Sequence, residues 1–251
     1  MKRGINIFLE ENERIDDLEY KGLKIVQNKN GFCFGIDSIL LSDFAKDIKK
    51  ESEVLDLGTG TGIISILLCG KTNLKHITGV EIQKHVYKMA KKSIKLNNLE
   101  NRFEIVNEDI KKLSKIFPAN SFDAIVTNPP YKKESTGLTS KDKTQLISRH
   151  EVMCNIDDIA KISSYLLKSN CSIYMVHRPD RLINIIEALR KYKLEPKKIR
   201  FVYPKIGKEP NLILVKATKG AKEFLKVEKP LVVYNEDGTY TDEILEIYNK
   251  K

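Results

Sequence analysis

Residues 54 to 63 read Val54-Leu55-Asp56-Leu57-Gly58-Thr59-Gly60-Thr61-Gly62-Ile63, an apolar run that leads into three glycines at alternate positions. The run predicts a buried strand, and the apolar residues that follow predict a helix packed on the same sheet. Glycine tolerates positive φ and lets the backbone approach a ligand closely. A strand, a glycine-rich turn and a helix are typical of a nucleotide-type site. Because the pattern is D-x-G-x-G-x-G and not G-x-G-x-x-G, a nicotinamide or flavin cofactor is disfavoured.

Three further apolar runs end in a residue that accepts hydrogen bonds: Glu81, Asp109 and Asn128. Glu81 lies 25 residues beyond Asp56, near the spacing at which an acid meets ribose hydroxyls, although a surface glutamate is the alternative. Asp109 has an alternative role as the N-cap of a helix over 110–117. Ligands bind outside the carboxyl ends of the strands in an open parallel sheet, so the four side chains are predicted to converge on one crevice.

The tetrapeptide Asn128-Pro129-Pro130-Tyr131 follows the apolar run 122–127. Two consecutive prolines cannot continue a central strand, because neither has an N–H for the ladder. They stiffen the backbone where the strand leaves the sheet. This arrangement suits a planar, amine-bearing group that Asn128 hydrogen-bonds and Tyr131 stacks on. The alternative is an ordinary loop punctuated by proline.

These motifs resemble those of a known family. Residues 55–62 are similar to the first motif of the class I S-adenosylmethionine-dependent methyltransferases, and residues 128–131 to the motif of those that methylate planar amines or amides. Over residues 18–240 the chain resembles the bacterial tRNA N6-adenosine methyltransferases that act at adenosine 37, beside the anticodon, and most of all their mollicute and firmicute branch. The similar segments are Gly31–Phe44, Arg149–Glu151, Val176–Pro179 and Arg200–Lys205.

The resemblance implies an α/β, Rossmann-like class I methyltransferase fold, with a seven-stranded, mostly parallel sheet, an antiparallel last strand and helices on both faces. The alternation of apolar patterns agrees with a parallel α/β sheet. Strands are predicted at 53–57, 77–81, 103–107, 122–127, 171–177, 199–203 and 211–217, and helices at 62–70, 84–97, 110–116, 156–168 and 179–192. The short 204–210 connection predicts antiparallel pairing of the last two strands.

We expect a single methyltransferase domain over residues 1–251. Residues 1–50 are predicted to form an N-terminal extension, with a hairpin of 18–26 and 31–35 and a helix from Ser38 to Lys46 that Asp37 caps. Residues 51–218 form the Rossmann-like core. The C-terminal extension, 219–251, is charged and has no evident role in the core. The oligomeric state is not predicted.

The cofactor that the resemblance implies is S-adenosylmethionine. The residues implied to bind it are Asp56, Gly58, Gly60, Gly62, Glu81, Asp109, Ile110 and Asn128. The glycines would meet its methionine end, and Glu81 would accept from its ribose hydroxyls. Asp109 would accept from its adenine amine, with Ile110 over the ring. Asp56 would orient the glycine turn or the methionine ammonium.

The residues implied to act in catalysis are Asn128, Pro129 and Tyr131. The lone pair of a ring-bound amine is delocalised, which makes the amine a weak nucleophile. The Asn128 amide oxygen and the Pro129 carbonyl would bind its two hydrogens and stabilise the positive charge that develops on nitrogen. Tyr131 would stack on the base, a contact worth about 1–3 kcal/mol in comparable complexes.

Basic residues supply candidate RNA contacts, and the expected partner is tRNA, bound at its anticodon stem-loop. The candidates are Lys132, Lys133, Arg149, His150, His177, Arg178, Arg181, Lys205 and Lys208. Residues 132–155 are long and polar enough to suggest a segment that closes over the target nucleotide. The alternatives are salt bridges to Glu151, Asp180 or Glu187, and ordinary solvation of lysine.

Composition agrees with this reading. The formal net charge is +10, which suits a polyanionic partner, although the lysines are dispersed. The four cysteines show no C-x-x-C spacing, so no metal site is predicted, and reduced thiols of a cytoplasmic protein are expected. No apolar stretch approaches the roughly 20 residues that span a bilayer, so no membrane partner is expected.

Other functions remain open. A protein-glutamine methyltransferase of the release-factor type also binds a planar amide, but such enzymes carry a larger N-terminal domain than the 53 residues that precede Val54. A DNA-adenine methyltransferase more often has Asp at the first motif position and a sizeable target-recognition region. A non-catalytic RNA-binding relative would not require intact glycines, acids and Asn128.

Overall fold

The central strand of the sheet is β3 (Glu53–Leu57), which pairs in parallel with β4 (His76–Val80) on one side and with β6 (Phe122–Thr127) on the other. The computed structural model describes residues 7–29, 35–130 and 154–251. Val54, Leu55 and Leu57 are at most 1% exposed. Helices cover both faces of this strand, which is why it reads as a nearly continuous apolar run.

In the described part of the chain the sheet has nine strands, ordered β10-β8-β9-β7-β6-β3-β4-β5, with β11 also paired to β8. The other strands are β5 (Phe103–Val106), β7 (Leu167–His177), β8 (Leu194–Lys205), β9 (Leu212–Lys219), β10 (Lys226–Val227) and β11 (Leu231–Tyr234). All pairs are parallel except the two that β9 makes with β7 and β8. The predicted fold class, with its reversed last core strand, is confirmed. The predicted number of seven strands was too low, because β10 and β11 of the C-terminal segment pair with β8.

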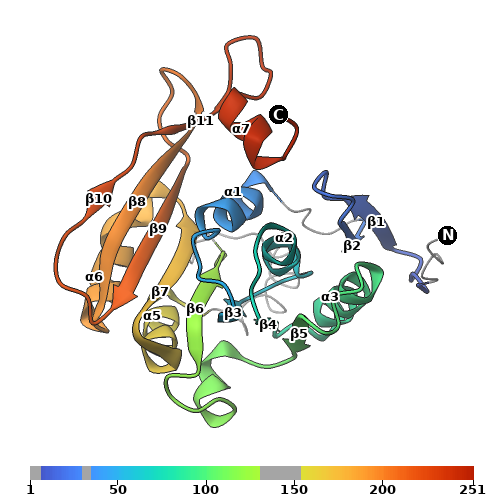
Figure 1. Cartoon of the computed structure of the whole chain (residues 1–251), viewed down its shortest axis with the longest axis horizontal. Coiled ribbons are helices and arrows are strands. Elements are labelled where there is room, and N and C mark those ends of the chain that lie inside the picture. The colour runs from blue at the N-terminus through green and yellow to red at the C-terminus, as the bar shows by residue number, and fades with distance from the viewer. Residues whose placement is uncertain (1–6, 30–34, 131–153) are drawn as a thin grey trace, which may run out of the picture.

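Helices lie on both faces of the sheet (Figure 1). One face packs against α1 (Ile36–Phe44), α2 (Ile63–Lys71), α3 (Lys84–Leu96) and α7 (Asp242–Ile247), and the other against η1 (Ile110–Lys115), α5 (Ile156–Leu166) and α6 (Leu182–Lys191). Successive strand residues point to opposite faces. Val54 therefore belongs to the first core and Leu55 to the second.

The N-terminal hairpin is present, but its predicted position was wrong. β1 (Glu13–Asp17) pairs with β2 (Lys24–Asn28), so residues 18–23 form the turn and not a strand. Glu19, Lys21 and Gly22 have φ of +53°, +50° and +70°, values that interrupt an extended chain. Of the predicted second arm, residues 31–34 lie outside the described residues.

Several helix boundaries also differ from prediction. The predicted helix 156–168 ends at Leu166, because residues 167 and 168 begin β7. α1 begins at Ile36 after Gly35, so Asp37 lies in the first turn and is not the N-cap. The predicted helix 179–192 divides into the 3₁₀ turn η2 (Pro179–Arg181) and α6. The proline suits this start, because its missing N–H is one that the first turn leaves unbonded.

The C-terminal extension contributes to the core, so the expectation that it has no core role was wrong. β10 and β11 extend the sheet by pairing with β8, and α7 follows them. Leu231, Val233 and Ile244 are at most 3% exposed. The inward residues of β11 alternate with the half-buried Val232 and the exposed Tyr234, and this short alternation is masked in the sequence by the charged residues around it.

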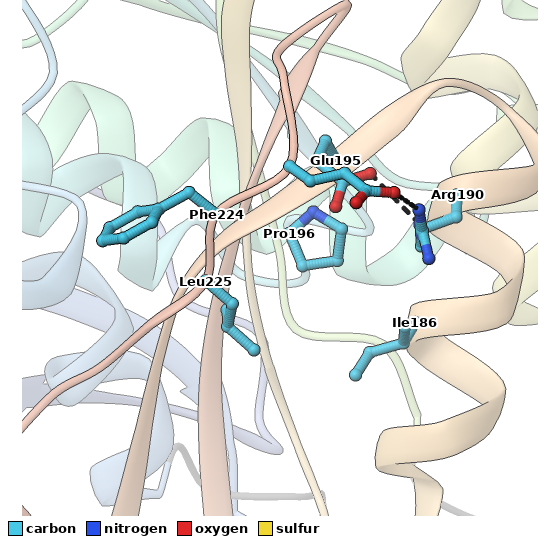
Figure 2. A pocket seen from close by; sticks show the side chains of 7 residues that line it. Ile186, Arg190, Glu195, Pro196, Phe224 and Leu225 are labelled. Atoms are coloured by element: carbon cyan, nitrogen blue, oxygen red, sulfur yellow. Dashed lines mark hydrogen bonds and ion pairs between the residues drawn. The ribbon is translucent and has the colours of Figure 1, made fainter.

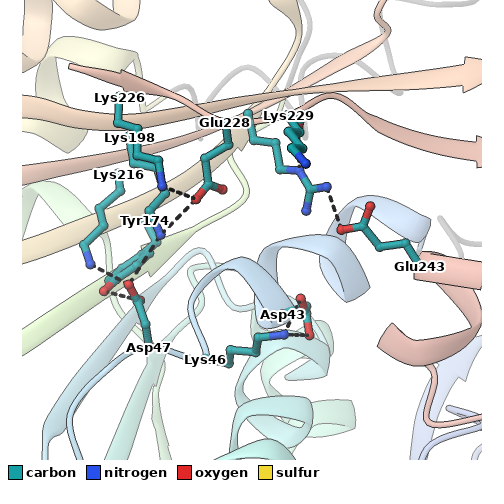
Figure 3. A network of polar contacts seen from close by, with 11 residues as sticks. Asp43, Lys46, Asp47, Tyr174, Lys198, Lys216, Lys226, Glu228, Lys229 and Glu243 are labelled. Atoms are coloured by element: carbon teal, nitrogen blue, oxygen red, sulfur yellow. Dashed lines mark hydrogen bonds and ion pairs between the residues drawn. The ribbon is translucent and has the colours of Figure 1, made fainter.

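A polar network joins the end of α1 to this side of the sheet (Figure 3). The Asp47 carboxylate accepts hydrogen bonds from the Tyr174 hydroxyl and the Lys216 ammonium, both at 2.8 Å. Burial opposes ionisation of Asp47, but its hydrogen bonds and the nearby lysines outweigh burial and hold the pKa of the carboxyl below its ordinary value. Arg200 donates to Glu243 at 2.6 Å and so ties α7 to β8.

Candidate active site

The glycine-rich turn follows the carboxyl end of β3. Gly58, Gly60 and Gly62 have φ of +72°, +60° and +92°, a region that side chains rarely adopt. A Cβ atom on Gly62 would lie 2.9 Å from the Phe103 ring, so the turn packs tightly against β5. Gly58 is exposed and has open space around it. The turn therefore offers accessible backbone to a ligand.

Asp56 holds this turn in place through hydrogen bonds. Its Oδ2 accepts hydrogen bonds from the Thr59 and Ser65 hydroxyls, both at 2.7 Å. The side chain is fully buried, and its Oδ1 has no hydrogen-bond partner among the described residues. Burial raises the pKa of the Asp56 carboxyl to about 6. Of the two predicted roles, this geometry fits orientation of the turn.

Glu81 connects the end of β4 to the same turn. Its Oε2 accepts from the Gly60 N–H at 3.1 Å, and its Oε1 accepts from the Gln83 N–H at 2.8 Å. The residue is 6% exposed, and burial raises the pKa of the Glu81 carboxyl above its ordinary value despite these hydrogen bonds. Each carboxylate oxygen has two lone pairs, so each can accept one hydrogen bond more.

Asp109 follows β5 and caps η1. Its Oδ1 accepts from the Lys111 N–H at 2.9 Å, so the alternative role as an N-cap is present in the structure. Asp109 and Ile110 are both half-buried, and the second carboxylate oxygen, Oδ2, lies 3.9 Å from the Lys111 ammonium. Asn107 donates to the carbonyl oxygens of Glu81 at 2.7 Å and Ile82 at 2.9 Å. This amide joins the carboxyl ends of β4 and β5.

Asn128 follows β6, directly beside β3 in the sheet. Its Nδ2 donates to Asp37 Oδ2 at 3.0 Å and lies 3.4 Å from the Ser38 hydroxyl. Pro129 is buried and Pro130 is exposed, so the chain turns outward after the first proline. Tyr131 lies outside the described residues.

The strand order brings the predicted residues to one edge. The strands β6, β3, β4 and β5 are neighbours in that order. Each carries one of the predicted residues at or just after its carboxyl end, in the same order: Asn128, Asp56, Glu81 and Asp109. All four strands are parallel. Their carboxyl ends therefore lie along the same edge of the sheet, which is the position of ligand sites in this class of fold.

The basic candidates are more dispersed. Arg178 is exposed beside the end of β7, with its Nε 3.4 Å from Asp180 Oδ1, so one of the alternative ion pairs is present. Lys205 donates to the Glu236 carbonyl at 3.3 Å. Arg181 is half-buried and Lys208 is exposed. Lys132, Lys133, Arg149 and His150 lie outside the described residues, as does most of the predicted 132–155 closing segment.

His177 has a placement that does not suit a phosphate contact. It is 3% exposed, and its Nδ1 accepts from the Arg178 N–H at 2.8 Å. Burial lowers the pKa of the imidazole. A neutral, covered ring has little attraction for a phosphate.

A groove lies elsewhere, between α6 and residues 223–225 (Figure 2). Ile186, Pro196 and Leu225 line it, together with Arg190, Glu195 and Phe224. Glu195 and Pro196 begin β8, so the groove is at the opposite edge of the sheet from Asn128. It contains no part of the candidate active site.

Two negative findings apply to residues 7–29, 35–130 and 154–251. No group of three or more histidine, cysteine, aspartate or glutamate side chains is arranged to hold a metal ion. No helix in those ranges combines the length and the apolar character needed to cross a bilayer.

Sequence reasoning missed three residues that shape the site. Thr59 and Asn107 hold the glycine turn and the end of β4, and Asp37 contacts Asn128 across 91 positions of sequence. Asp37 stood out only as a helix cap. The only signal in the sequence was the position of Asp37, a polar residue just before an apolar helix in the segment Gly31–Phe44. That position does not indicate a partner on a distant strand.

Comparison with known proteins agrees with this geometry. A family model described as the methyltransferase small domain matches residues 24–150. A tRNA1(Val) (adenine(37)-N6)-methyltransferase of Haemophilus influenzae is 27% identical over 91% of this chain and 94% of its own length. A protein of the same name from Phocaeicola vulgatus is 26% identical over 87% of this chain and 92% of its own length.

Solved structures give the same fold. A predicted O-methyltransferase from Agrobacterium tumefaciens superposes with a TM-score of 0.69 and 20% identity, over 85% of this chain and 96% of its own. TYW2 of M. jannaschii, in complex with AdoMet, has a TM-score of 0.56 and 16% identity, over 84% of this chain and 87% of its own. With the glycine turn, the row of acids and Asn128 at one edge of the sheet, this chain belongs to the methyltransferase small domain family.

Proposed function

We propose that this protein transfers a methyl group from S-adenosylmethionine to the exocyclic N6 amine of adenosine 37 in a tRNA. The observation that carries the proposal is the position of Asn128, which follows β6 beside the glycine turn, with its amide nitrogen already bonded. Relatives named for this reaction match 87% or more of the chain.

The described residues fit the cofactor. S-adenosylmethionine, when bound, supplies an electrophilic methyl group on its sulfonium. The accessible backbone at Gly58 and Gly60 suits its methionine end. Glu81 would accept from the ribose hydroxyls through its remaining lone pairs, and Asp109 would accept from the adenine amine beside Ile110. Asp56 holds the turn in place through Thr59 and Ser65.

The target amine is held by two acceptors. The Asn128 Oδ1 and the Pro129 carbonyl take its two hydrogens, which favours a pyramidal nitrogen with its lone pair directed at the methyl carbon. As the new C–N bond formed, the bond between the methyl carbon and the sulfonium would break and its electron pair would stay on sulfur as a neutral thioether. Positive charge would then develop on the amine nitrogen, where these fixed dipoles would stabilise it. One amine proton then leaves to solvent. Tyr131, which follows the two prolines in sequence, is proposed to stack on the base.

An adenosine in a loop suits this site. A base must leave its stack to reach Asn128, and the cost is lower in a single-stranded loop than in a duplex. Arg178 and Lys208 are exposed near the ends of β7 and β8, where they would contact backbone phosphates. Arg181, Lys205 and the basic residues at 132, 133, 149 and 150 are further candidates for this anticodon-stem-loop surface.

The same proposal covers the setting of the enzyme. We take residues 1–251 as one domain, because the N-terminal hairpin and α7 share a core with β3. A cytoplasmic location follows from a tRNA substrate. The release-factor and DNA-adenine alternatives predict transfer to protein or to duplex DNA, and a non-catalytic relative predicts no transfer at all.

Tritiated methyl transfer tests the proposal. The substrates are unmodified tRNA transcripts, duplex DNA and release factor, with Asn128→Ala as the inactive comparison. We expect label in tRNA adenosine at position 37, and a loss of about 10²–10³-fold in kcat for Asn128→Ala with little change in cofactor affinity. Label only in protein or DNA would contradict the tRNA assignment, and equal losses of kcat and cofactor affinity would contradict the role of Asn128.

A further inference from the structure

Asp37 and Asn128 belong to segments far apart in sequence that meet at the active edge. Asp37 lies in the first turn of α1 and is 7% exposed. Its Oδ2 accepts from Asn128 Nδ2 at 3.0 Å, and its Oδ1 accepts from the Ser38 N–H at 2.9 Å. The carboxylate is therefore fixed by a backbone group of its own helix while it holds the amide of the neighbouring strand end.

The chemistry of the pair decides which way the amide points. An ionised carboxylate only accepts hydrogen bonds, whereas the two ends of an asparagine amide differ, one being a donor and the other an acceptor. If the amide were rotated by half a turn, Asn128 Oδ1 would face Asp37 Oδ2 at about the same 3.0 Å, with no proton between the two oxygens. The NH₂ end therefore faces Asp37, and Oδ1 is directed away from it.

We infer that Asp37 is a positioning residue for methyl transfer, which fixes the Asn128 amide with its oxygen presented to the target amine. The inference rests on the proposed function, because it assigns Oδ1 as the acceptor of an amine hydrogen. Without the Asp37 carboxylate this contact no longer selects one orientation of the amide, and in the rotated orientation the NH₂ group would repel the amine. The expected loss is therefore in kcat, while cofactor binding at the glycine turn is unaffected.

Gly35 provides the space that Asp37 occupies. A Cβ atom at position 35 would lie 2.8 Å from Asp37 Oδ1, closer than real contacts allow. The φ of Gly35 is −100°, so alanine is compatible with its backbone, and the effect of the substitution is confined to this contact. Gly35→Ala thus displaces the Asp37 carboxylate by a second route that leaves its charge intact.

A purely structural role for Asp37 makes different predictions. An acid in the first turn stabilises a helix by interacting with its dipole, and its loss would lower the melting temperature and weaken every function together. Asp37→Asn keeps the size of the side chain and an oxygen for the Ser38 N–H. Asp43→Asn is the matched control, since it removes the same charge from the same helix, where Asp43 pairs with Lys46 and Lys71.

The first experiment is a double-mutant cycle. The variants are Asp37→Asn, Asn128→Ala, their combination, Gly35→Ala and Asp43→Asn, assayed for kcat on tRNA and for S-adenosylmethionine affinity. We expect Asp37→Asn and Gly35→Ala to lower kcat at least ten-fold with cofactor affinity within two-fold. We expect the double variant to be no slower than Asn128→Ala alone. Multiplied losses, or wild-type kcat in both Asp37→Asn and Gly35→Ala, would overturn the inference.

The second experiment needs no activity and so separates this inference from the proposed function. The side-chain NH₂ protons of Asn128 are identified in NMR spectra by their absence in Asn128→Ala. They are expected to lose hydrogen-exchange protection and to shift in Asp37→Asn but not in Asp43→Asn. Unchanged resonances in Asp37→Asn would overturn the positioning role. If the resonances change in Asp37→Asn as expected but the wild-type protein methylates no tRNA, the positioning role stands and the proposed substrate is wrong.

Discussion

The Glu81 carboxylate accepts a hydrogen bond from the Gly60 N–H at 3.1 Å, which joins the end of β4 to the glycine turn after β3. The acid that shapes the turn is therefore also the residue that we propose to bind the cofactor ribose. Glu81 is buried, so water could take the place of its carboxylate only if the glycine turn became exposed to solvent.

Glu81→Gln is expected to weaken S-adenosylmethionine binding. Hydrogen bonds to charged groups contribute about 1.5–3 kcal/mol each, so the loss is about ten-fold or more in affinity. Isothermal titration calorimetry measures it directly. Glu104→Gln, on the neighbouring strand and largely exposed, is the control and should bind normally. Equal affinity of the two variants would contradict the ribose assignment.

Gly62→Ala is expected to destabilise the fold. The substitution places a Cβ 2.9 Å from the Phe103 ring at a φ of +92°. Gly207→Ala shares a positive φ of +76° but meets no atom within 4 Å. The steric term alone should therefore separate the two variants by about 1–3 kcal/mol in the free energy of unfolding. Urea denaturation tests this, and identical midpoints would refute the clash.

Asp56 gives the stability a specific dependence on pH. Its folded pKa of about 6 lies above the ordinary value of 3.8, so between these two pH values the folded state holds a proton that the unfolded state releases. Stability is therefore highest below pH 4 as far as this group is concerned, and it falls by up to about 3 kcal/mol as pH rises through 6. Asp56→Asn removes the ionisation. The free energy of unfolding of both proteins can be measured by denaturation at pH 4 to 7.5. With rising pH, the wild type should lose stability relative to the variant.

Asp47 has the opposite sign. Its pKa is lowered from 3.8 in the folded state, so its contribution to stability is present above that value and is lost as pH falls through the folded pKa. Asp47→Asn should lower the melting temperature at pH 7, and the difference should shrink below pH 3.8. The half-exposed position keeps the effect modest. A constant difference at all pH values would show that packing, not charge, is responsible.

The core of the fold was predictable because its signals are local. Val54, Leu55 and Leu57 are apolar because both faces of β3 are covered, and the acids at positions 81 and 109 mark where the next strands leave the sheet. The reversal of β9 also followed from local evidence, since the connection from Pro204 to Pro210 is too short for a crossover.

The remainder depended on pairing between distant segments. β11 is four residues long and joins the sheet by pairing with β8, a strand that lies more than 25 residues earlier in the chain. The hairpin register depends on positive φ at Glu19 and Lys21, residues that carry no strong turn signal. The Asp37–Asn128 contact spans 91 positions, and nothing in either local sequence specifies the other.

The packing of the C-terminal segment determines when the core can be completed during synthesis of the chain. Val233 and Ile247 share one core cluster with Leu18 near the start of the chain, and the Lys71 ammonium donates to the Ile247 carbonyl at 3.0 Å. A ribosome produces residues 233–247 after the strands β1 to β10. The face that carries α1 and α2 therefore cannot be fully covered until these residues have been synthesised, so its apolar surface is complete as a core only after α7 packs against it.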